Sequence, residues 1–270
     1  MCPHCRAFIT TKDRVCPYCN ERVGPRAIDA RSDAPIAGGF IPQARFTTMM
    51  ILLINVGLYI ATVLYSMRHG NSDAFMNLDL QTLYAFGGKF RPAIAEGQWW
   101  RLVTAGFLHG GLLHIGMNMW VLFDLGAQVE QVFGTARLLV IYFCANICGF
   151  YFSTMFSDAL SVGASAALFG LIGAMLALGV RHRLSAAGSA IRSLYMRWVI
   201  YGLLFSLIPG IDMAAHIGGL IAGFGVGYAA GSPRVRDSLA ERFWHAAAWF
   251  CILITAVCFL KWYLWFSHGA

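Results

Sequence analysis

The stretch that decides the fold is residues 213–230, MAAHIGGLIAGFGVGYAA, which contains no charged residue. A helix needs about 20 mostly apolar residues to cross a bilayer, so this stretch predicts a transmembrane helix. Gly219, Gly223 and Gly227 recur every four residues and predict a smooth stripe against which another helix can pack closely. His216 lies about one turn into the stretch, and an ionisable side chain at membrane depth indicates a functional site.

The composition of the whole chain agrees with a membrane protein. Of its 270 residues 58% are hydrophobic and only 12% are charged, and the mean hydropathy is +0.62. Soluble domains carry about 25% charged residues, so a water-soluble globule and a disordered chain are both excluded. Six more apolar stretches bring the predicted spans to seven, and they cover residues 49–66, 102–123, 138–157, 163–180, 198–208 and 243–260. The stretch 198–208 is the shortest, because Pro209-Gly210 ends it.

The positions of the basic residues predict how the chain is oriented. The net charge of +7 is compatible with nucleic-acid binding, but in a membrane protein basic residues mark cytoplasmic loops. They gather before the first span, in 181–197 and in 234–242, whereas the short loops 158–162 and 209–212 carry none. We therefore expect a cytoplasmic N-terminus, an outside C-terminus and no nucleic-acid partner. A compact helical bundle without an evident targeting peptide favours a bacterial inner membrane.

The first residues of the chain carry a metal-ligand pattern. Cys2, Cys5, Cys16 and Cys19 have the spacing C-x2-C-x10-C-x2-C, which can offer four sulfurs to one tetrahedral zinc ion. A segment this small cannot form a core, so the metal would supply its folding energy. Redox-active or unliganded cysteines are the alternative. The pattern predicts a zinc-ribbon-like segment over 1–28 with a structural or docking role, followed by a linker rich in Ala, Gly and Pro over 29–45.

A serine and a histidine are expected to meet inside the membrane. Ser165 lies near the start of span 163–180 and His216 near the start of 213–230, and both spans begin on the same side. A serine hydroxyl becomes a useful nucleophile when a base such as histidine takes its proton. A lone serine can instead bond its own backbone, and a lone histidine can bridge helices. Asp212 is four residues before His216, but no acidic third member of the site is evident.

Span 102–123 offers donors for an oxyanion. His114 and Asn118 are four residues apart and therefore share one helical face. Together with the backbone N–H of Ser165 they can stabilise a tetrahedral intermediate of acyl transfer, although Asn118 can equally hydrogen-bond a neighbouring helix. A zinc metalloprotease is not indicated, because His109 and His114 are five apart with no glutamate between them. His109 is better interpreted as a supporting residue at the edge of a loop.

Taken together, these motifs resemble those of the rhomboid intramembrane serine proteases. The resemblance covers residues 46–230 and rests on five features: Gln98-Trp99-Trp100-Arg101, the run from His109 to Asn118, Gly163-Ala164-Ser165-Ala166, Asp212-Met213-Ala214-Ala215-His216, and the Gly219/Gly223 stripe. It implies an all-α polytopic protein with a six-helix core, to which the seventh helix within 231–270 and the cysteine segment are additions. It also implies cleavage of membrane-anchored substrates without a catalytic cofactor.

The resemblance assigns a role to each matching residue. Ser165 would be the nucleophile, His216 the general base, and His114 and Asn118 the oxyanion donors. The supporting residues would be Phe169, packed against the base, the glycines Gly163 and Gly219, and Arg101 in a structural motif of the first loop. Ala166 departs from the glycine that often follows the serine, and Gly210 is one place off the G-x-x-x-A-H pattern.

Two other functions remain as alternatives. A catalytically inactive relative would bind membrane clients without cutting them, but the intact Ser165/His216 pair argues against it. A channel or transporter would need ionisable residues across the full depth of the membrane, whereas here they cluster towards one face. If the protein is a protease, we expect its substrates to be membrane proteins that reach the site laterally near span 198–208. The sequence leaves substrate identity and oligomeric state open.

Overall fold

The computed structural model describes residues 2, 4–5, 7, 13, 15–23, 45–233 and 238–268. In these ranges the protein is all-helical, and its strand-like pairings are the isolated bridges Val15–Arg22 and Lys89–Ser161. The predicted fold class, an all-α polytopic membrane protein, is confirmed. Of the predicted linker only Arg45 is described, so the proposed boundary between the cysteine segment and the membrane core lies outside the described residues.

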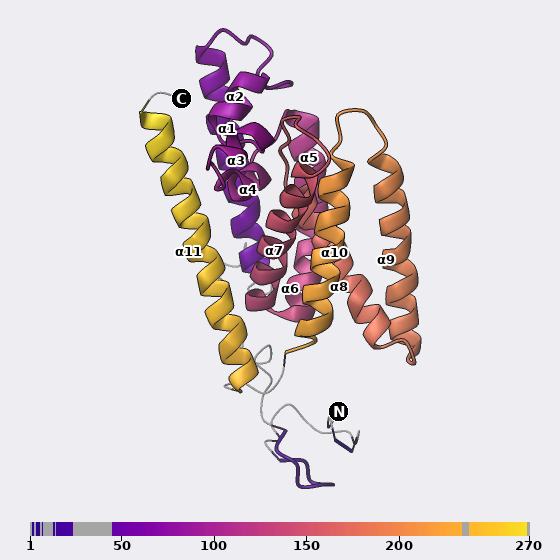
Figure 1. Cartoon of the computed structure of the whole chain (residues 1–270). Helices are drawn as coiled ribbons and strands as arrows, with labels where there is room; N and C mark the ends of the chain where they lie inside the picture. Colours follow the sequence, from indigo (N-terminus) through magenta and orange to yellow (C-terminus); the bar gives the residue numbers. More distant parts are fainter. Residues whose placement is uncertain are drawn as a thin grey trace, which may run out of the picture.

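Seven helical rods run side by side through the described part of the chain (Figure 1). Four of them, α1, α7, α10 and α11, are each long and apolar enough to cross a membrane. The rods are α1 (Phe46–Arg68), a continuous rod of α5 (Leu112–Val121), η4 (Leu122–Gly126) and α6 (Ala127–Phe133), α7 (Thr135–Thr154), α8 (Ser165–Arg181), α9 (Ala186–Phe205), α10 (Met213–Ala230) and α11 (Leu239–Ser267). Element η4 is a single π-helical turn within the second rod.

The second rod begins ten residues later than the sequence predicts. Residues 102–123 are uncharged throughout, but α4 (Arg101–Thr104) and η3 (Ala105–Phe107) form a separate short helical piece, and the long rod begins only at Leu112. His109 therefore lies in the connection, as a residue at the edge of a loop. Gly110-Gly111 interrupts the helix, and Gly111 also lies so close to the carbonyl of Met76 that a side chain has no room there.

Helix α9 is also longer than the predicted span 198–208. It begins at Ala186, capped by the hydroxyl of Ser185, which accepts a hydrogen bond from the N–H of Gly188. Arg192 and Arg197, which the sequence places in a loop, lie on the exposed side of this helix. They are the seventh and twelfth of the 20 residues of α9, and the long stem of arginine can carry the charge towards the interface.

Helix α8 is the centre of the bundle, with fourteen of its 17 residues buried. Helix α10 packs directly against it along the glycine stripe that the sequence predicts. A Cβ atom on Gly219 would lie 2.0 Å from the carbonyl oxygen of Ala166, and one on Gly223 would lie 2.0 Å from that of Gly170. The two backbones therefore touch, which fixes the separation of the first turns of α8 and α10.

The loop between α1 and α5 is packed rather than extended, and it contains α2 (Leu80–Ala85), α3 (Arg91–Ala95) and α4. Arg101 is fully buried there. Its guanidinium donates to the carbonyl oxygens of Tyr84 and Gly88 and to the Gln98 side chain. Lys89 pairs through its backbone with Ser161, four residues before Ser165. The loop thereby supports the segment that leads into α8.

The charged residues Glu130 and Arg137 hold helices together. The Glu130 carboxylate accepts hydrogen bonds from the N–H groups of Thr47 and Thr48 at 3.3 and 3.0 Å, and so stabilises the first turn of α1. Arg137 on α7 forms a two-pronged ion pair with Glu241 on α11, with distances of 2.8 and 2.7 Å. Both partners of this pair are buried.

Candidate active site

Ser165 and His216 meet at the N-terminal ends of two helices. Ser165 is the first residue of α8, and His216 lies in the first turn of α10. The Ser165 Oγ lies 2.7 Å from the His216 Nε2, within hydrogen-bond range. The backbone contact between α8 and α10 at Gly219 is one turn from the histidine, so the close packing of these helices positions both side chains. The two residues that the sequence pairs are therefore brought together.

The imidazole of His216 is held on its face and on its far edge. The Phe169 ring stacks on it with a centroid distance of 4.2 Å and an interplanar angle of 14°. The Nδ1 atom lies 2.6 Å from the hydroxyl oxygen of Ser206, which follows the last residue of α9. Sequence reasoning placed Phe169 here but missed Ser206. A serine three residues before Pro209 and ten residues ahead of His216 was the available signal.

Asp212 takes a role other than that of a partner for His216. It caps α10 by accepting a hydrogen bond from the N–H of Ala215 at 2.9 Å. Its second oxygen accepts from the Ser153 hydroxyl at 2.5 Å, which ties the cap to the end of α7. Asp212 therefore fixes the start of the helix that carries the histidine.

His114 lies beside Ser165, and the nitrogen that carries its ring proton can be assigned. Its Nδ1 accepts a hydrogen bond from the backbone N–H of Gly110 at 3.2 Å, so the ring proton resides on Nε2. A Cβ atom on Gly163 would lie 2.8 Å from His114 Nε2 and 3.5 Å from Ser165 Oγ. Gly163 also has a φ of +135°, which favours glycine. Glycine thus leaves an open position between the hydroxyl and the His114 N–H.

The other expected donors are the Asn118 amide, one turn after His114 on α5, and the Ser165 backbone N–H at the start of α8. Asn118 uses one N–H of its amide for the carbonyl of His114 at 2.8 Å, and an amide nitrogen carries two. The Ser165 N–H belongs to the first turn of α8, where backbone donors lack helical acceptors. His109 packs edge-on against His114, with ring centroids 5.1 Å apart, and its Nε2 accepts from the Ala164 N–H at 3.5 Å. It therefore supports the donors rather than a metal.

The methyl group of Ala166 lies away from this position. It packs against α7 at Gly149, where an added Cβ would come within 2.8 Å of it. Ala166 is 1% exposed and belongs to a small cluster with Ala105, Phe150 and Ala215. The departure from glycine after the serine thus fills a helix contact. A hydroxyl, an imidazole acceptor and converging N–H donors together can perform acyl transfer.

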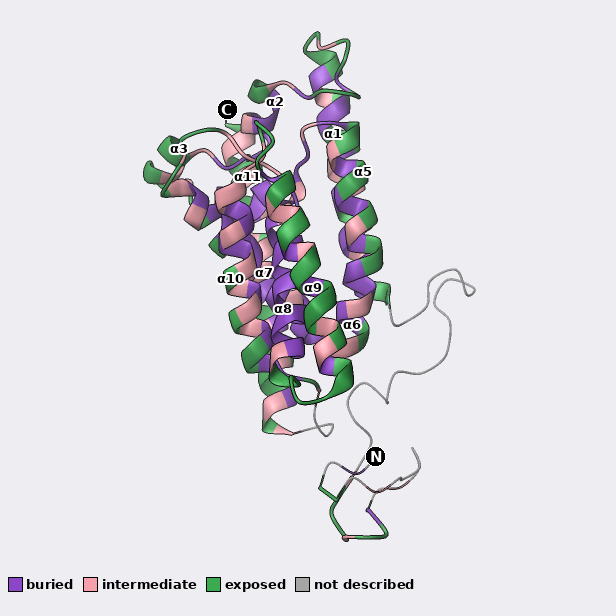
Figure 2. Cartoon of the chain, turned by 90° about the vertical axis from the view of Figure 1, so that its right-hand side faces the viewer, coloured by how far each residue is buried: buried purple, intermediate pink, exposed green. Residues whose placement is uncertain are grey.

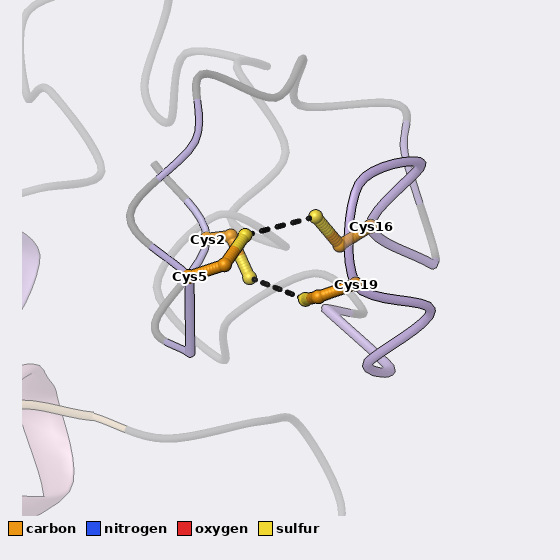
Figure 3. A group of neighbouring side chains, drawn as sticks. All are labelled: Cys2, Cys5, Cys16 and Cys19. Atoms are coloured by element: carbon orange, nitrogen blue, oxygen red, sulfur yellow. Dashed lines mark hydrogen bonds between the residues drawn. The ribbon is translucent and has the colours of Figure 1, made fainter.

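The four N-terminal cysteines converge on one point, as Figure 3 shows. Their sulfur atoms all lie within 4.8 Å of one another, and the Cys2–Cys19 and Cys5–Cys16 pairs are each 3.6 Å apart. Four sulfurs at about 2.3 Å from a tetrahedral zinc ion are roughly 3.8 Å apart, so the donor set fits this metal.

Each Cys-x-x-Cys pair lies on a similar backbone loop. The N–H of Cys2 donates to the carbonyl of Ala7, and the N–H of Cys16 donates to the carbonyl of Glu21, so both bonds span five residues. Asn20 adopts a φ of 55° in the second loop, a conformation that asparagine tolerates better than most residues. Two equivalent loops facing each other can close a four-sulfur site.

Comparison with protein families identifies the membrane core. A family model described as the Rhomboid domain matches residues 96–233. The match includes Ser165, His216, His114 and Asn118, and it ends just after α10.

Several characterised relatives are similar to the same region. Rhomboid protease GluP of Bacillus subtilis (strain 168) is 40% identical over 158 residues, which cover 57% of this chain and 30% of that protein. RHOMBOID-like protein 7 of Arabidopsis thaliana is 40% identical over 168 residues, 61% of this chain and 53% of that protein. Rhomboid-like protease 2 of Toxoplasma gondii is 32% identical over 183 residues, 66% and 63% of the two chains. The chain thus spans about a third to two thirds of the length of these relatives.

Proposed function

The chain belongs to the rhomboid family, and on that premise we propose that it is an intramembrane serine endopeptidase that cleaves transmembrane-helix-containing substrates with a Ser165–His216 dyad. The observation that carries the proposal is the 2.7 Å contact between Ser165 Oγ and His216 Nε2 beside an open position at Gly163. No catalytic cofactor is needed for this chemistry.

The reaction follows from the donors and acceptors around Ser165. His216 Nε2 accepts the hydroxyl proton while Oγ attacks the substrate carbonyl carbon. The negative charge on the carbonyl oxygen is stabilised by the N–H groups of His114, Asn118 and Ser165. The protonated imidazole then gives its proton to the leaving amine. Water, activated by the same imidazole, hydrolyses the acyl-enzyme and restores the hydroxyl.

The substrate must expose an extended backbone to Ser165. A helix hides its carbonyl groups, so we expect small and helix-weakening residues near the cut, since glycine weakens a helix by about 1 kcal/mol relative to alanine. We propose lateral access beside α9, whose outer end carries exposed Tyr201 and Leu204. The distribution of basic residues supports a bacterial inner membrane protein with its N-terminus in the cytoplasm and its C-terminus outside.

The test is cleavage of a reporter transmembrane helix in liposomes. Ser165→Ala and His216→Ala should each lower the rate by about 10⁴-fold or more, and His114→Ala by about 10²–10³-fold. His245→Ala, at an exposed position on α11, is the matched histidine control and should cleave normally. Persistent cleavage by Ser165→Ala would rule out the dyad. A wild type that binds the reporter without cutting it would identify an inactive relative.

We also propose that Cys2, Cys5, Cys16 and Cys19 hold a structural zinc ion. The support is the agreement between the sulfur separations and tetrahedral coordination. The purified wild type should contain about one zinc ion per chain, and Cys2→Ser and Cys19→Ser should lose it. Cys148→Ser, at an exposed position of α7, is the matched control and should keep it. Unchanged zinc content in the first two variants would contradict the site.

A further inference from the structure

We infer that Ser206 is a positioning residue that sets the tautomer of His216 and thereby links the general base to helix α9. The inference rests on the proposed function, because it concerns how the dyad is prepared for reaction. It begins from the contact between the Ser206 hydroxyl and the side of the imidazole that faces away from Ser165.

The direction of the hydrogen bonds around Ser206 can be assigned. Its Oγ lies 2.7 Å from the carbonyl oxygen of Gly202 and 2.6 Å from His216 Nδ1. A hydroxyl has one proton to donate, and a carbonyl oxygen can only accept. Ser206 therefore donates to Gly202 and accepts from a proton on His216 Nδ1.

This assignment gives the histidine the form that its chemistry requires. In a neutral imidazole with the proton on Nδ1, the Nε2 atom carries a lone pair. Nε2 is the atom 2.7 Å from Ser165 Oγ, so it is ready to accept the hydroxyl proton. The opposite tautomer would present an N–H to the serine and could not act as its base.

Helix α9 also holds the face of the imidazole. A Cβ atom on Gly202 would lie 2.7 Å from the Phe169 ring, so the α9 backbone rests against that ring. Phe169 in turn stacks on His216. The last turn of α9 thus contacts the base directly through Ser206 and indirectly through Phe169, and an outward movement of this turn would remove both supports.

A neutral hydroxyl suits this location better than a carboxylate. Ser206 is 3% exposed and His216 is 5% exposed, so the contact is shielded from water. An ionised carboxylate at such a depth carries a large desolvation cost unless it is fully paired. Ser206 can orient the ring without introducing that charge.

A serine near a helix end often bonds the carbonyl four residues before it for purely local reasons. In that case Ser206→Ala would affect only the end of α9 and would leave catalysis unchanged. The two roles therefore make different predictions for turnover and for the state of His216.

The kinetic test uses the full chain in liposomes with the reporter helix. Ser206→Ala should lower kcat by about 10-fold, the equivalent of one lost hydrogen bond, and leave KM within about 2-fold. Ser206→Thr keeps the hydroxyl and should retain kcat within about 3-fold of the wild type. Ser193→Ala, at an exposed serine of the same helix, is the matched control and should leave both constants unchanged.

A spectroscopic test reports on the tautomer itself. In protein labelled with ¹⁵N-histidine, the His216 signals are identified by their loss in His216→Gln. They should show a protonated Nδ1 in the wild type and in Ser206→Thr, and a shift towards protonated Nε2 in Ser206→Ala. An unchanged tautomer together with unchanged kcat in Ser206→Ala would overturn the inference. If the wild type does not cleave at all, the proposed function fails, while the tautomer measurement still decides whether Ser206 positions the ring.

Discussion

Helices α9 and α11 flank the bundle in different ways. Helix α11 is fastened near both ends: Glu241 pairs with Arg137, and the indole N–H of Trp262 donates to the carbonyl of Ala85 at 2.9 Å. Helix α9 is packed more closely in its first part than in its last turn, which contacts the bundle through Gly202 and the adjoining Ser206. Its buried residues, Gly188, Tyr195 and Val199, lie in the first two thirds, and Figure 2 shows much of this helix as exposed or half-buried.

The difference indicates where the bundle can open. The loosely packed end of α9 is the end beside Ser165 and His216, whereas α11 closes over the first loop, with Trp265 against Arg101. Regions with few buried contacts open at a lower free energy than tightly packed ones. A substrate helix would therefore displace α9 more readily than α11.

The largest effect is expected at the N-terminal fastening of α11, where Glu241 pairs with Arg137. Arg137→Ala removes the buried two-pronged ion pair with Glu241 and should lower the free energy of unfolding by about 3–5 kcal/mol. The measurement is an SDS titration in mixed micelles. A double replacement, Arg137→Met with Glu241→Leu, should lower the free energy of unfolding less than Arg137→Ala does, because it removes both charges of the pair. If Arg137→Ala is as stable as the wild type, α11 is no better fastened than α9.

A medium effect is expected at the loop between α1 and α5, which the C-terminal end of α11 contacts. Asp79 accepts hydrogen bonds from Ser66 and from the backbone and side chain of Thr82. Asp79 is the N-cap residue of α2. Asp79→Asn keeps the shape of this side chain but loses its charge, and should lower the free energy of unfolding by up to about 1 kcal/mol at neutral pH.

The same residue predicts a pH dependence. Burial alone would raise the pKa of Asp79, but the bonds from Ser66 and Thr82 outweigh it and lower the pKa to about 2. Its stabilisation is therefore complete above the unfolded value near 4 and is lost as the pH falls towards 2. The wild type should approach Asp79→Asn in stability over this range. A constant difference between them would contradict the assigned contacts.

The smallest effect on stability is expected at the loose end of α9. Leu204→Ala, at an exposed position, should change the free energy of unfolding by less than about 0.5 kcal/mol. A photoreactive residue at position 204 in the Ser165→Ala background should nevertheless capture the reporter helix. The matched position on α11 is exposed Leu264, which should capture much less. Equal capture at both positions would remove the proposed distinction between the two helices.

The sequence predicted the parts of the site that depend on helix periodicity. His114 and Asn118 were placed on one face by their spacing, and the glycine stripe correctly indicated the contact that brings Ser165 and His216 together. These features are local or nearly so, because a helix fixes the direction of each side chain relative to its neighbours.

Features that depend on turns and irregular backbone could not be predicted in the same way. An uncharged run cannot distinguish a helix from a buried loop, so the predicted second span included the break at Gly110-Gly111. Ser206 lies across a turn from His216, and its contact depends on how Pro209-Gly210 directs the chain. The partner of Arg137, Glu241, lies 104 residues away and has no periodic relation to it.

The π-helical turn Leu122–Gly126 separates two parts of the second rod whose side chains have different contacts. Before it, the second rod carries His114 and Asn118, the proposed oxyanion donors; after it, Glu130 reaches the start of α1. One residue advances an α-helix by about 100°, and a π turn accommodates one residue more than an α turn. Deleting one residue within 122–126 would rotate the part after the turn against the part before it by about this angle. A regular helix over this stretch could give His114 and Asn118 their present direction or give Glu130 its present direction, but not both.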